Sequence, residues 1–252
     1  MGFVKKVEIA GHSGWLIGKT ALVLHLNRHG GSSMPPFDSL NLSLAVGDDP
    51  RSVAENLSTA ASLSSARRLT GLRQVHGTEL LCVDDAPFAV QEGGLEPEAD
   101  GLLTDTAGVG LLIRTADCQA VSIIDPKRPA ISNIHCGWRG IAGGLIGRAV
   151  SEMERIYGSE PAELVAVIGP SIGACCCQFR HWRSLLPGWM QKFVDSRAHI
   201  DLKAASCHML MECGLTPERI LVSPECTVCN SSYFSYRRDG ITGRNGTVAL
   251  LL

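Results

Sequence analysis

Residues 109–140, VGLLIRTADCQAVSIIDPKRPAISNIHCGWRG, decide the fold of this chain. They contain three compact apolar runs, at residues 109–113, 120–124 and 130–134, which are separated by aspartate, proline and glycine. Short apolar runs that are bounded by turn-forming residues are typical of buried β-strands. The segment therefore predicts three buried strands, with helix the alternative that periodicity alone leaves open.

Helical patterns lie on both sides of this segment. Asp49 supplies an N-cap, Pro50 occupies the first helical position, and apolar residues recur at helical spacing through residue 63. A second apolar face predicts a helix over residues 141–156, which ends at Gly158. The other expected elements are strands at residues 20–26, 164–168 and 247–252, two short apolar runs within residues 67–83, an exposed loop over residues 84–99, and two helices within residues 181–213. This mixture of strands and helices predicts the α/β class.

Composition narrows the class of partner. The 252 residues include 23 basic and 25 acidic side chains, and 5% of the residues are aromatic. A net charge near zero, without a basic stripe, argues against a nucleic-acid surface and favours a small-molecule substrate. No stretch approaches the ~18 apolar residues of a membrane span, and the N-terminus lacks the apolar core of a signal peptide. We therefore expect a soluble, cytoplasmic protein without a membrane partner, whose ten cysteines are reduced thiols.

Three separate segments each end an apolar run with a metal-binding side chain: His76, Cys118 and His135. Two imidazoles and one thiolate leave the fourth position of a tetrahedral ion open, which is typical of a catalytic zinc site. Any one of these residues alone is more often structural, because histidines are commonly satisfied inside a fold and cysteines are among the most buried residues.

Eight motifs, in a fixed order, favour a metal-binding role for these three residues over a structural one. The chain resembles the YfiH-type, laccase-domain family, whose members are described both as multicopper polyphenol oxidases and as zinc-dependent purine nucleoside enzymes. The matching motifs are residues 27–31 (NRHGG), 37–49 (FDSLNLSLAVGDD), 74–77 (QVHG), 98–104 (EADGLLT), 116–118 (ADC), 135–140 (HCGWRG), 169–173 (GPSIG) and 236–244 (YRRDGITGR). Because the motifs cover most of the chain, we expect a single domain over residues 1–252.

The resemblance implies a fold, a metal and a reaction. The fold would be a layered sandwich of mixed β-sheets flanked by helices, an architecture shared with cysteine hydrolases. His76, Cys118 and His135 would bind Zn²⁺, with copper the weaker alternative. A zinc with this ligand set keeps a net positive charge, which lowers the pKa of a bound water towards ~7. The implied activities are phosphorolysis of adenosine-, inosine-, guanosine- or methylthioadenosine-type nucleosides and deamination of adenosine.

Phosphorolysis requires an anion site and deamination requires a proton carrier. Arg28 and Arg139 are the candidate phosphate ligands, since a guanidinium group binds phosphate through two hydrogen bonds. Asn41 is a candidate hydrogen-bond partner of the substrate. Asp117 would carry a proton or orient a ligand imidazole, and an equally good interpretation is a turn aspartate that caps backbone amides.

Other interpretations use the same residues. In a cysteine hydrolase or deamidase, Cys118 would be the nucleophile and His135 its base, and no metal would be needed. In that case His76 is superfluous, whereas it completes a zinc site. A copper polyphenol oxidase is weaker, because several coppers need many histidines and only eight are present. The last alternative is a binding or maturation factor that keeps the pocket but has lost catalytic activity through the change at Gln178.

Several positions depart from the expected pattern. Cys136 replaces the alanine that is usual in the family, and we expect it to face away from the metal, since neighbouring residues of a strand point to opposite faces. Cys177 and Gln178 stand where the family usually has Tyr and Glu. Cys226 and Cys229 form a CxxC motif without a second pair at zinc-ribbon spacing, so we interpret them as structural thiols, with a redox or metal-binding role as the weaker alternative.

Overall fold

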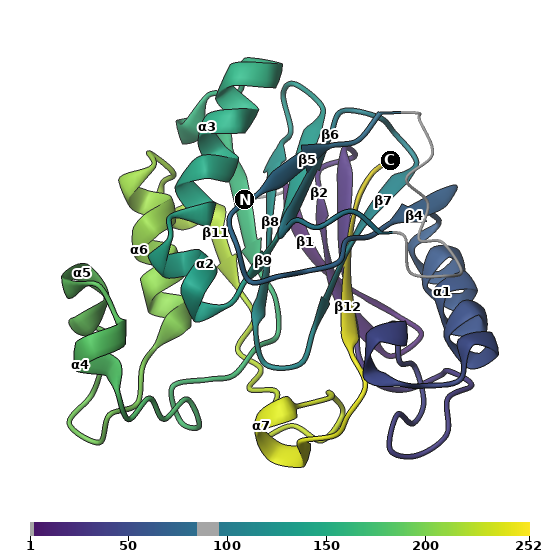
Figure 1. The fold of residues 1–252 in the computed structure, drawn as a ribbon. Coiled ribbons are helices and arrows are strands. Elements are labelled where there is room, and N and C mark those ends of the chain that lie inside the picture. The colour runs from purple at the N-terminus through teal and green to yellow at the C-terminus, as the bar shows by residue number, and fades with distance from the viewer. Residues whose placement is uncertain (1–2, 85–95) are drawn as a thin grey trace.

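Two six-stranded sheets form the centre of the molecule (Figure 1). The computed structural model describes residues 3–84 and 96–252. The expected loop over residues 84–99 therefore lies mostly outside the described residues. The first sheet has the strand order β1 (Val4–Ile9), β2 (His12–Ile17), β3 (Ala21–Leu26), β12 (Asn245–Leu251), β7 (Val109–Thr115) and β4 (Arg68–Thr70). The second has the order β11 (Ile220–Val222), β10 (Val165–Ile168), β8 (Gln119–Asp125), β9 (Ala130–Cys136), β6 (Gly101–Thr104) and β5 (Leu80–Cys82).

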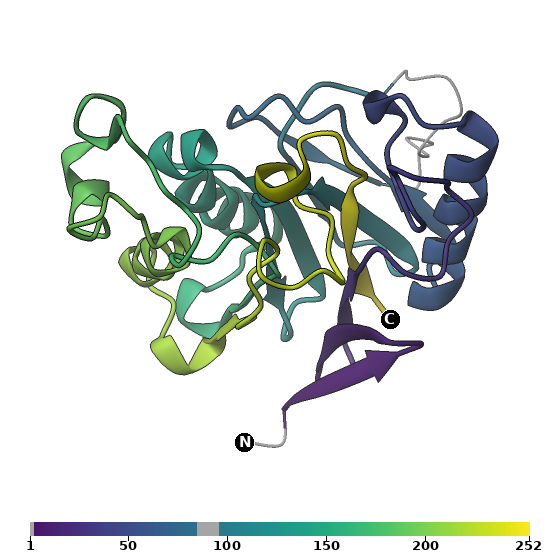
Figure 2. The same ribbon diagram turned by 90° about the horizontal axis from the view of Figure 1, so that it is seen from below.

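Both sheets are mixed. In the first sheet β4 pairs with β7 in parallel, and in the second sheet β5–β6 and β10–β11 are parallel pairs, while the other pairs are antiparallel. The helices of the described residues are α1 (Pro50–Ser64), α2 (Trp138–Ala142), α3 (Leu145–Tyr157), α4 (Trp182–Leu185), α5 (Gly188–Gln191), α6 (Leu202–Glu212) and α7 (Tyr236–Asp239), with short 3-10 turns at Leu44–Val46, Pro161–Glu163 and Pro217–Arg219. Helices α1, α3 and α6 cover the outer faces of the sheets, whereas α7 lies at one end of the strands (Figures 1 and 2).

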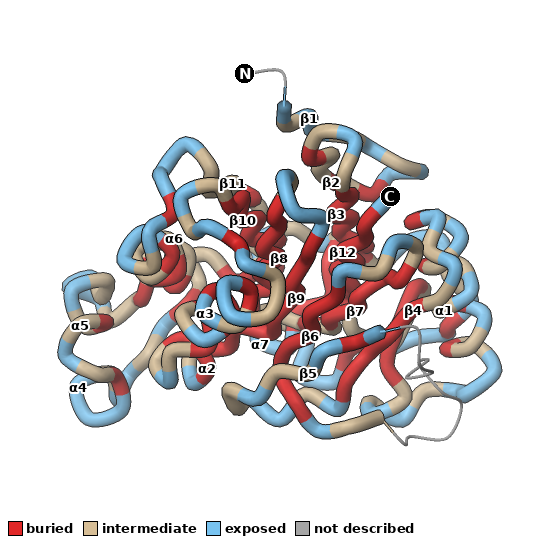
Figure 3. The backbone as a smooth tube through the Cα atoms, turned by 90° about the horizontal axis from the view of Figure 1, so that it is seen from above, coloured by how far each residue is buried: buried red, intermediate tan, exposed pale blue. Residues whose placement is uncertain are grey.

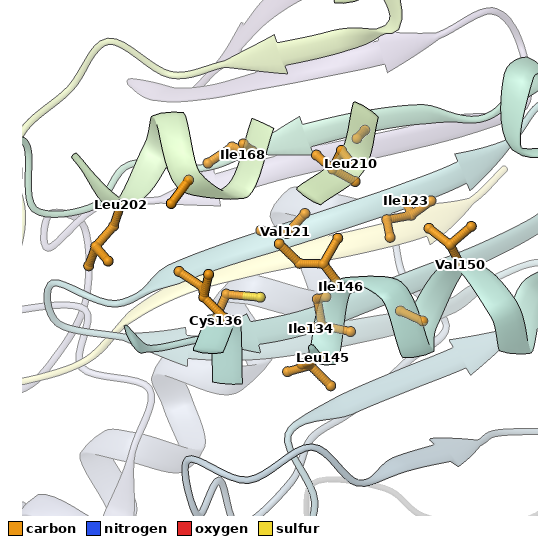
Figure 4. Close-up of a cluster of buried hydrophobic side chains, with 14 of the residues drawn as sticks. Val121, Ile123, Ile134, Cys136, Leu145, Ile146, Val150, Ile168, Leu202 and Leu210 are labelled. Carbon is orange, nitrogen blue, oxygen red and sulfur yellow. The ribbon is translucent and has the colours of Figure 1, made fainter. Parts of the chain in front are cut away.

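Three apolar clusters hold the layers together. One lies between the sheets and joins residues such as Val23 and Leu111 to Ile131 and Val167. A second packs α3 and α6 on the outer face of the second sheet (Figure 4). A third packs α1 on the outer face of the first sheet, on the opposite side of the molecule (Figure 2). Figure 3 shows the buried residues concentrated along the strands. The fold is therefore the predicted α/β layered sandwich, in which each element buries one apolar face.

The predicted elements are mostly confirmed, and the differences have local causes. The strands expected at residues 109–113, 120–124 and 130–134 are β7, β8 and β9, and α1 begins after the Asp49 N-cap. The helix predicted over residues 141–156 is wrong at its start, because Gly144 adopts a left-handed conformation with φ 81° and separates α2 from α3. The region 181–213 holds three helices instead of two, and the β1–β2 hairpin was not predicted.

None of the helices in residues 3–84 and 96–252 combines the length and the apolar character that crossing a membrane requires.

Candidate metal centre

The candidate ligands converge because several strands of both sheets begin or end at one end of the molecule. Cys118 directly precedes β8, and His135 lies near the end of β9, where it pairs with Ala120. Since β8 and β9 are antiparallel, the start of one lies beside the end of the other. β6 and β9 are also antiparallel, which brings Asp100, just before β6, to the same end. Figure 2 looks onto this end, with α7 in front of the strands.

His76 reaches the same place from the loop between β4 and β5. Its backbone is left-handed, with φ 60°, a conformation that is uncommon for residues other than glycine and clusters at functional sites. The Asp100 carboxylate fixes the loop by accepting hydrogen bonds from the backbone N–H groups of His76 (2.9 Å) and Gly77 (2.6 Å). Gln74 adds two hydrogen bonds with the backbone of Arg114 on β7, of 2.8 and 2.9 Å.

The structure brings the three predicted ligands together. One ligand atom from each of His76, Cys118 and His135 lies within 4.8 Å of the other two. Cys118 Sγ is 4.0 Å from His76 Nε2, and the two imidazole rings meet edge to face with centroids 4.7 Å apart. His76 is exposed, Cys118 is half-buried and His135 is buried. The set has the borderline donors that Zn²⁺ prefers and offers access from one side.

Asp100 is the residue of the site that sequence reasoning missed. It is 0% exposed, and its Oδ1 lies 2.8 Å from Nδ1 of His135. Burial opposes ionisation of this carboxyl, but hydrogen bonds from His135 and Gly77 keep its pKa below the ordinary value. A carboxylate on one ring nitrogen fixes the tautomer and leaves the other nitrogen free to bind a metal. The sequence offered one signal for Asp100: it lies in the EADGLLT motif directly before a strand, a position from which a side chain can reach a site at the end of the sheet.

Cys118 lies in an environment that favours the thiolate. Burial would raise the pKa of this thiol, but interactions with His135 and His76 lower it to about 6. For His135 burial has the opposite sign and lowers the pKa. The interactions of the imidazole with Asp100 and Cys118 outweigh the burial and raise the pKa of His135 to about 9. The thiolate is the form that binds metals and acts as a nucleophile, and metal binding would release the imidazole proton.

Gly137 gives the centre its shape. A Cβ atom at this position would lie 3.0 Å from Cδ2 of His76 and 3.2 Å from Sγ of Cys118. These separations are shorter than ordinary van der Waals contact, so a side chain here would push the two ligands apart. The glycine between His135 and α2 therefore lets the backbone lie directly against the ligand set.

Asp117 anchors a neighbouring loop. Its carboxylate accepts hydrogen bonds from Thr227 Oγ1 (2.7 Å), Ser235 Oγ (2.7 Å) and the backbone N–H of Arg237 (2.6 Å). Its own backbone is left-handed, with φ 97°. These contacts match the capping interpretation of Asp117 and tie the segment before α7 to the residue next to Cys118. Its role as a proton carrier stays a prediction.

The two predicted phosphate ligands lie in different environments. Arg28 donates from Nε to the backbone oxygen of Asp38 at 2.7 Å and forms an ion pair with the side-chain carboxylate of the same residue at 3.1 Å. Its guanidinium group also stacks over the ring of Phe234. Arg139 is exposed and lies over the Trp138 ring, 4.4 Å from the ring centroid. It belongs to α2, which begins at Trp138, so the expected helix start near residue 141 is wrong by three residues. Phosphate binding by either arginine stays a prediction.

Asn41 supports a third arginine. Its side chain is 0% exposed, donates to Ser43 O (2.9 Å) and Asp48 Oδ2 (2.8 Å), and accepts from the backbone N–H of Arg244 (2.9 Å). In this conformation Asn41 positions the segment of Arg244, and its direct contact with substrate stays a prediction. Burial lowers the pKa of Arg244, whereas the charges of Cys118 and Asp117 raise it, so this cation lies within electrostatic range of the centre.

Cys136 lies in the cluster behind the second sheet, 0% exposed and among Ile134, Leu145 and Ile146 (Figure 4). This position agrees with the alternation of side chains along β9, which places its neighbour His135 on the other face. Cys177 is buried, Gln178 is exposed, and the carbonyl of Gln178 accepts a hydrogen bond from Arg237.

The fold and the ligand set define an α/β sandwich protein with three side chains that could hold a metal ion, and comparison with known proteins gives its family. The family model described as multi-copper polyphenol oxidoreductase laccase matches residues 22–252. The chain is 36% identical over 234 residues to purine nucleoside phosphorylase YlmD of Geobacillus stearothermophilus, covering 86% of this chain and 85% of the relative. It is 32% identical over 251 residues to purine nucleoside phosphorylase YfiH of Shigella flexneri, covering 94% and 97%.

Solved structures agree. The crystal structure of the hypothetical protein YfiH of Bacillus licheniformis superposes with a TM-score of 0.85 at 32% identity, covering 92% of this chain and 93% of the other. The crystal structure of YlmD from Geobacillus stearothermophilus superposes with a TM-score of 0.83 at 30% identity and covers 98% of both chains. The chain belongs to the YfiH family, whose model carries the multi-copper polyphenol oxidoreductase laccase description.

Proposed function

We propose that this protein is a zinc-dependent purine nucleoside phosphorylase whose metal is held by His76, Cys118 and His135. The observation that carries the proposal is the convergence of these three side chains within 4.8 Å at one end of the sandwich. The names of the relatives YlmD and YfiH support the reaction. A cytoplasmic location is part of the proposal, and the free state of all ten cysteines supports it.

The residues present fit a zinc ion. Asp100 occupies Nδ1 of His135 and fixes the loop of His76, so both imidazoles are oriented before a metal arrives. The environment of Cys118 favours the thiolate, and the three ligands leave one position for a reactant. When bound, zinc supplies a Lewis acid that polarises an oxygen or nitrogen of the substrate.

Phosphorolysis breaks the bond between C1′ and the purine nitrogen and forms a bond from C1′ to a phosphate oxygen. The electron pair of the broken bond leaves with the purine, which takes up a proton. The phosphate must be held by cations. We assign this role to Arg28 and Arg139, with Arg244 as a third candidate because it lies within electrostatic range of Cys118.

Deamination of adenosine is the second proposed activity. It replaces the amino group at C6 with oxygen from water and releases ammonia, so a group beside the substrate must carry a proton. Asp117 is the proposed carrier. Because its carboxylate already accepts three hydrogen bonds, we expect deamination to be slower than phosphorolysis.

The test is a metal-resolved activity assay. Purified protein is incubated with inosine and phosphate, and hypoxanthine and ribose 1-phosphate are measured before chelation, after chelation and after zinc is restored. We expect activity to disappear and return, and His76→Ala to be inactive. A zinc-loaded protein that leaves inosine, guanosine, adenosine and methylthioadenosine intact would reject the proposal.

One specific arrangement favours a second candidate function. Asp100, His135 and Cys118 form a chain in which a carboxylate orients an imidazole beside a thiolate, as in a cysteine hydrolase. His76 discriminates between the two functions. A hydrolase would tolerate His76→Ala and chelation and would be inactivated by thiol alkylation, whereas the phosphorylase loses activity in all three treatments. Copper at the centre would instead be revealed by metal analysis together with oxidation of a polyphenol.

A further inference from the structure

A second group of potential metal ligands lies outside the centre described above. Cys175 and Cys176 belong to the loop after β10, and Cys226 and Cys229 belong to the loop after β11. Because β10 and β11 are parallel neighbours, both loops leave the sheet at the same end. One sulfur from each of the four cysteines lies within 4.8 Å of the other three. The second cysteine pair, which the sequence spacing did not reveal, is thus supplied by another loop.

We propose that Cys175, Cys176, Cys226 and Cys229 bind a structural Zn²⁺ ion, in addition to any ion held by His76, Cys118 and His135. We call this group the four-cysteine cluster. A zinc with four thiolate ligands has no open position, and such sites stabilise local structure instead of performing chemistry. The proposal does not depend on the nucleoside activity.

The sulfur separations fit one ion. Cys229 Sγ lies 3.4 Å from Cys176 Sγ and 3.7 Å from Cys175 Sγ. Zinc–sulfur bonds of about 2.3 Å in tetrahedral geometry place neighbouring sulfurs roughly 3.8 Å apart. A disulfide would need a sulfur separation of about 2.05 Å, and all four cysteines are free. In an iron–sulfur cluster the thiolates bind different irons, so their sulfurs would be spread more widely.

Backbone amides prepare Cys226 to act as a metal ligand. The N–H of Gly173 points at Cys226 Sγ with a separation of 3.2 Å. The backbone N–H of Asn230 donates to the carbonyl of Cys226 at 2.9 Å, so the CxxC segment turns back on its first cysteine. Amides directed at a ligand atom hold it in place and stabilise the negative charge of a thiolate.

Three cationic side chains bond to the backbone near the cluster, which suits the charge of a metal-bound form. Four thiolates and one Zn²⁺ carry a net charge of minus two, after the four thiols release four protons. Lys203 Nζ donates to the carbonyls of Ser223 and Glu225 at 2.7 Å each and is partly buried. Arg237 donates to the Cys176 carbonyl at 2.9 Å, and Arg238 donates to the Thr227 carbonyl at 2.8 Å. Three positive side chains therefore hold the two loops that carry the sulfurs.

The proposed ion would fasten the loop that adjoins the metal centre. Thr227 lies inside the CxxC segment, and both Thr227 and Ser235 donate to the carboxylate of Asp117, the neighbour of Cys118. A zinc that ties residues 226–229 to residues 175–176 would thereby order the segment before α7. We expect its loss to loosen this segment and not to remove the three ligands of the centre.

Metal content of the whole protein tests the proposal. Native mass spectrometry and elemental analysis of protein prepared under reducing conditions with zinc should find about two zinc ions per chain. The double variant Cys226→Ser/Cys229→Ser should retain about one. The matched control, Cys82→Ser/Cys213→Ser, changes two cysteines outside both clusters and should retain two. Loss of one zinc in the control as well would overturn the proposal.

A second pair of variants protects against misfolding. Cys229→His keeps a zinc ligand and should keep the second ion, whereas Cys229→Ala should bind it at least about tenfold more weakly. After replacement of zinc by Co²⁺, the thiolate-to-cobalt absorption should fall by more than half in Cys226→Ser/Cys229→Ser.

The two metal sites fail in distinguishable ways. Cys118→Ala should remove the ion of the centre and leave the cobalt–thiolate absorption of the four-cysteine cluster. A reduced wild-type protein that binds one zinc, and loses it in Cys118→Ala, would overturn the inference while leaving the centre intact. An intact mass lower by two hydrogens, with a mapped disulfide among the four cysteines in protein prepared with reductant and zinc, would also overturn it.

Discussion

The two ligand clusters of this chain differ in donor type, support and closure. The centre takes three ligands from strand ends and a neighbouring loop, and the fully buried Asp100 orients the two histidines. The four-cysteine cluster takes four sulfurs from two adjacent loops, and two of these cysteines are exposed. Three ligands leave a position for a reactant and four thiolates leave none. Under the two proposals, the three-ligand centre would perform chemistry and the four-cysteine cluster would stabilise the loops beside it.

The most severe test of this comparison is Cys118→Ala. We expect the centre to lose its metal and phosphorolysis to fall by about 1000-fold or more, because a Lewis acid contributes several kcal/mol to the barrier. The four-cysteine cluster should keep its zinc. Kinetics with inosine and phosphate, measured beside zinc content, check both statements, and Cys82→Ala is the exposed-cysteine control. Simultaneous loss of both ions would mean that the clusters are not independent.

Asp100→Asn tests the support of the centre and should have the next largest effect. The amide cannot accept from three backbone N–H groups and an imidazole as the carboxylate does. Loss of such an orienting partner typically lowers metal affinity or activity by about 10–100-fold.

The matched control is Asp125→Asn, since Asp125 is also 0% exposed and accepts two backbone hydrogen bonds, from Lys127 and Arg128, at the far end of β8. Zinc affinity is measured by competition with a chelator. Equal affinities for the Asp100 and Asp125 variants would assign Asp100 a purely structural role.

Much of the fold could be predicted because its signals are local. The buried runs of β7, β8 and β9 carry their strand pattern in five to seven residues, and Asp49 with Pro50 marks the start of α1. The break between α2 and α3 escaped prediction because the apolar spacing continues through it. Only the left-handed Gly144 reveals the interruption.

The sites were predictable to a different degree. The three ligands of the centre were candidates because each ends an apolar run, but only the family resemblance joined them into one site, since no sequence spacing relates His76 to Cys118. Asp100 escaped because a lone aspartate before a strand has many roles. The two cysteine pairs are about 50 residues apart and meet through the parallel pairing of β10 with β11. Only this pairing of distant strands, which no local pattern encodes, shows that they form one cluster.

Two glycines allow a reciprocal test of independence. Gly137→Ala would place its Cβ 3.2 Å from Cys118 Sγ, and Gly173→Ala would place its Cβ 3.2 Å from Cys175 Sγ. Overpacking of this kind costs about 1–3 kcal/mol, so each variant should weaken zinc at its own cluster by roughly 5- to 150-fold. The neighbouring cluster should keep its affinity, and each variant is the control of the other. Equal weakening at both clusters would indicate one coupled unit.

The smallest expected effect concerns acidification, which must be separated from metal loss before the clusters are compared at low pH. His25 on β3 is 2% exposed, and burial lowers its pKa to about 4. Its Nδ1 lies 3.2 Å from Thr247 Oγ1, and its Nε2 has no hydrogen-bond partner among the described residues. The folded protein therefore resists protonation at a position where the unfolded chain accepts a proton near pH 6.5.

Because the pKa of His25 is lower in the folded state, its contribution to stability is present above pH 6.5 and is lost as the pH falls towards 4. By pH 5.5 this loss amounts to about 1 kcal/mol. Chemical denaturation of metal-free protein at pH 7.5 and 5.5 should show the loss in the wild type and a smaller one in His25→Gln. If both proteins lose the same stability, His25 is not the responsible group. The pH of zinc release is then compared between His25→Gln and the wild type, which differ in their stability towards acid. If both proteins release zinc at the same pH, the release is caused by protonation of the ligands and not by unfolding.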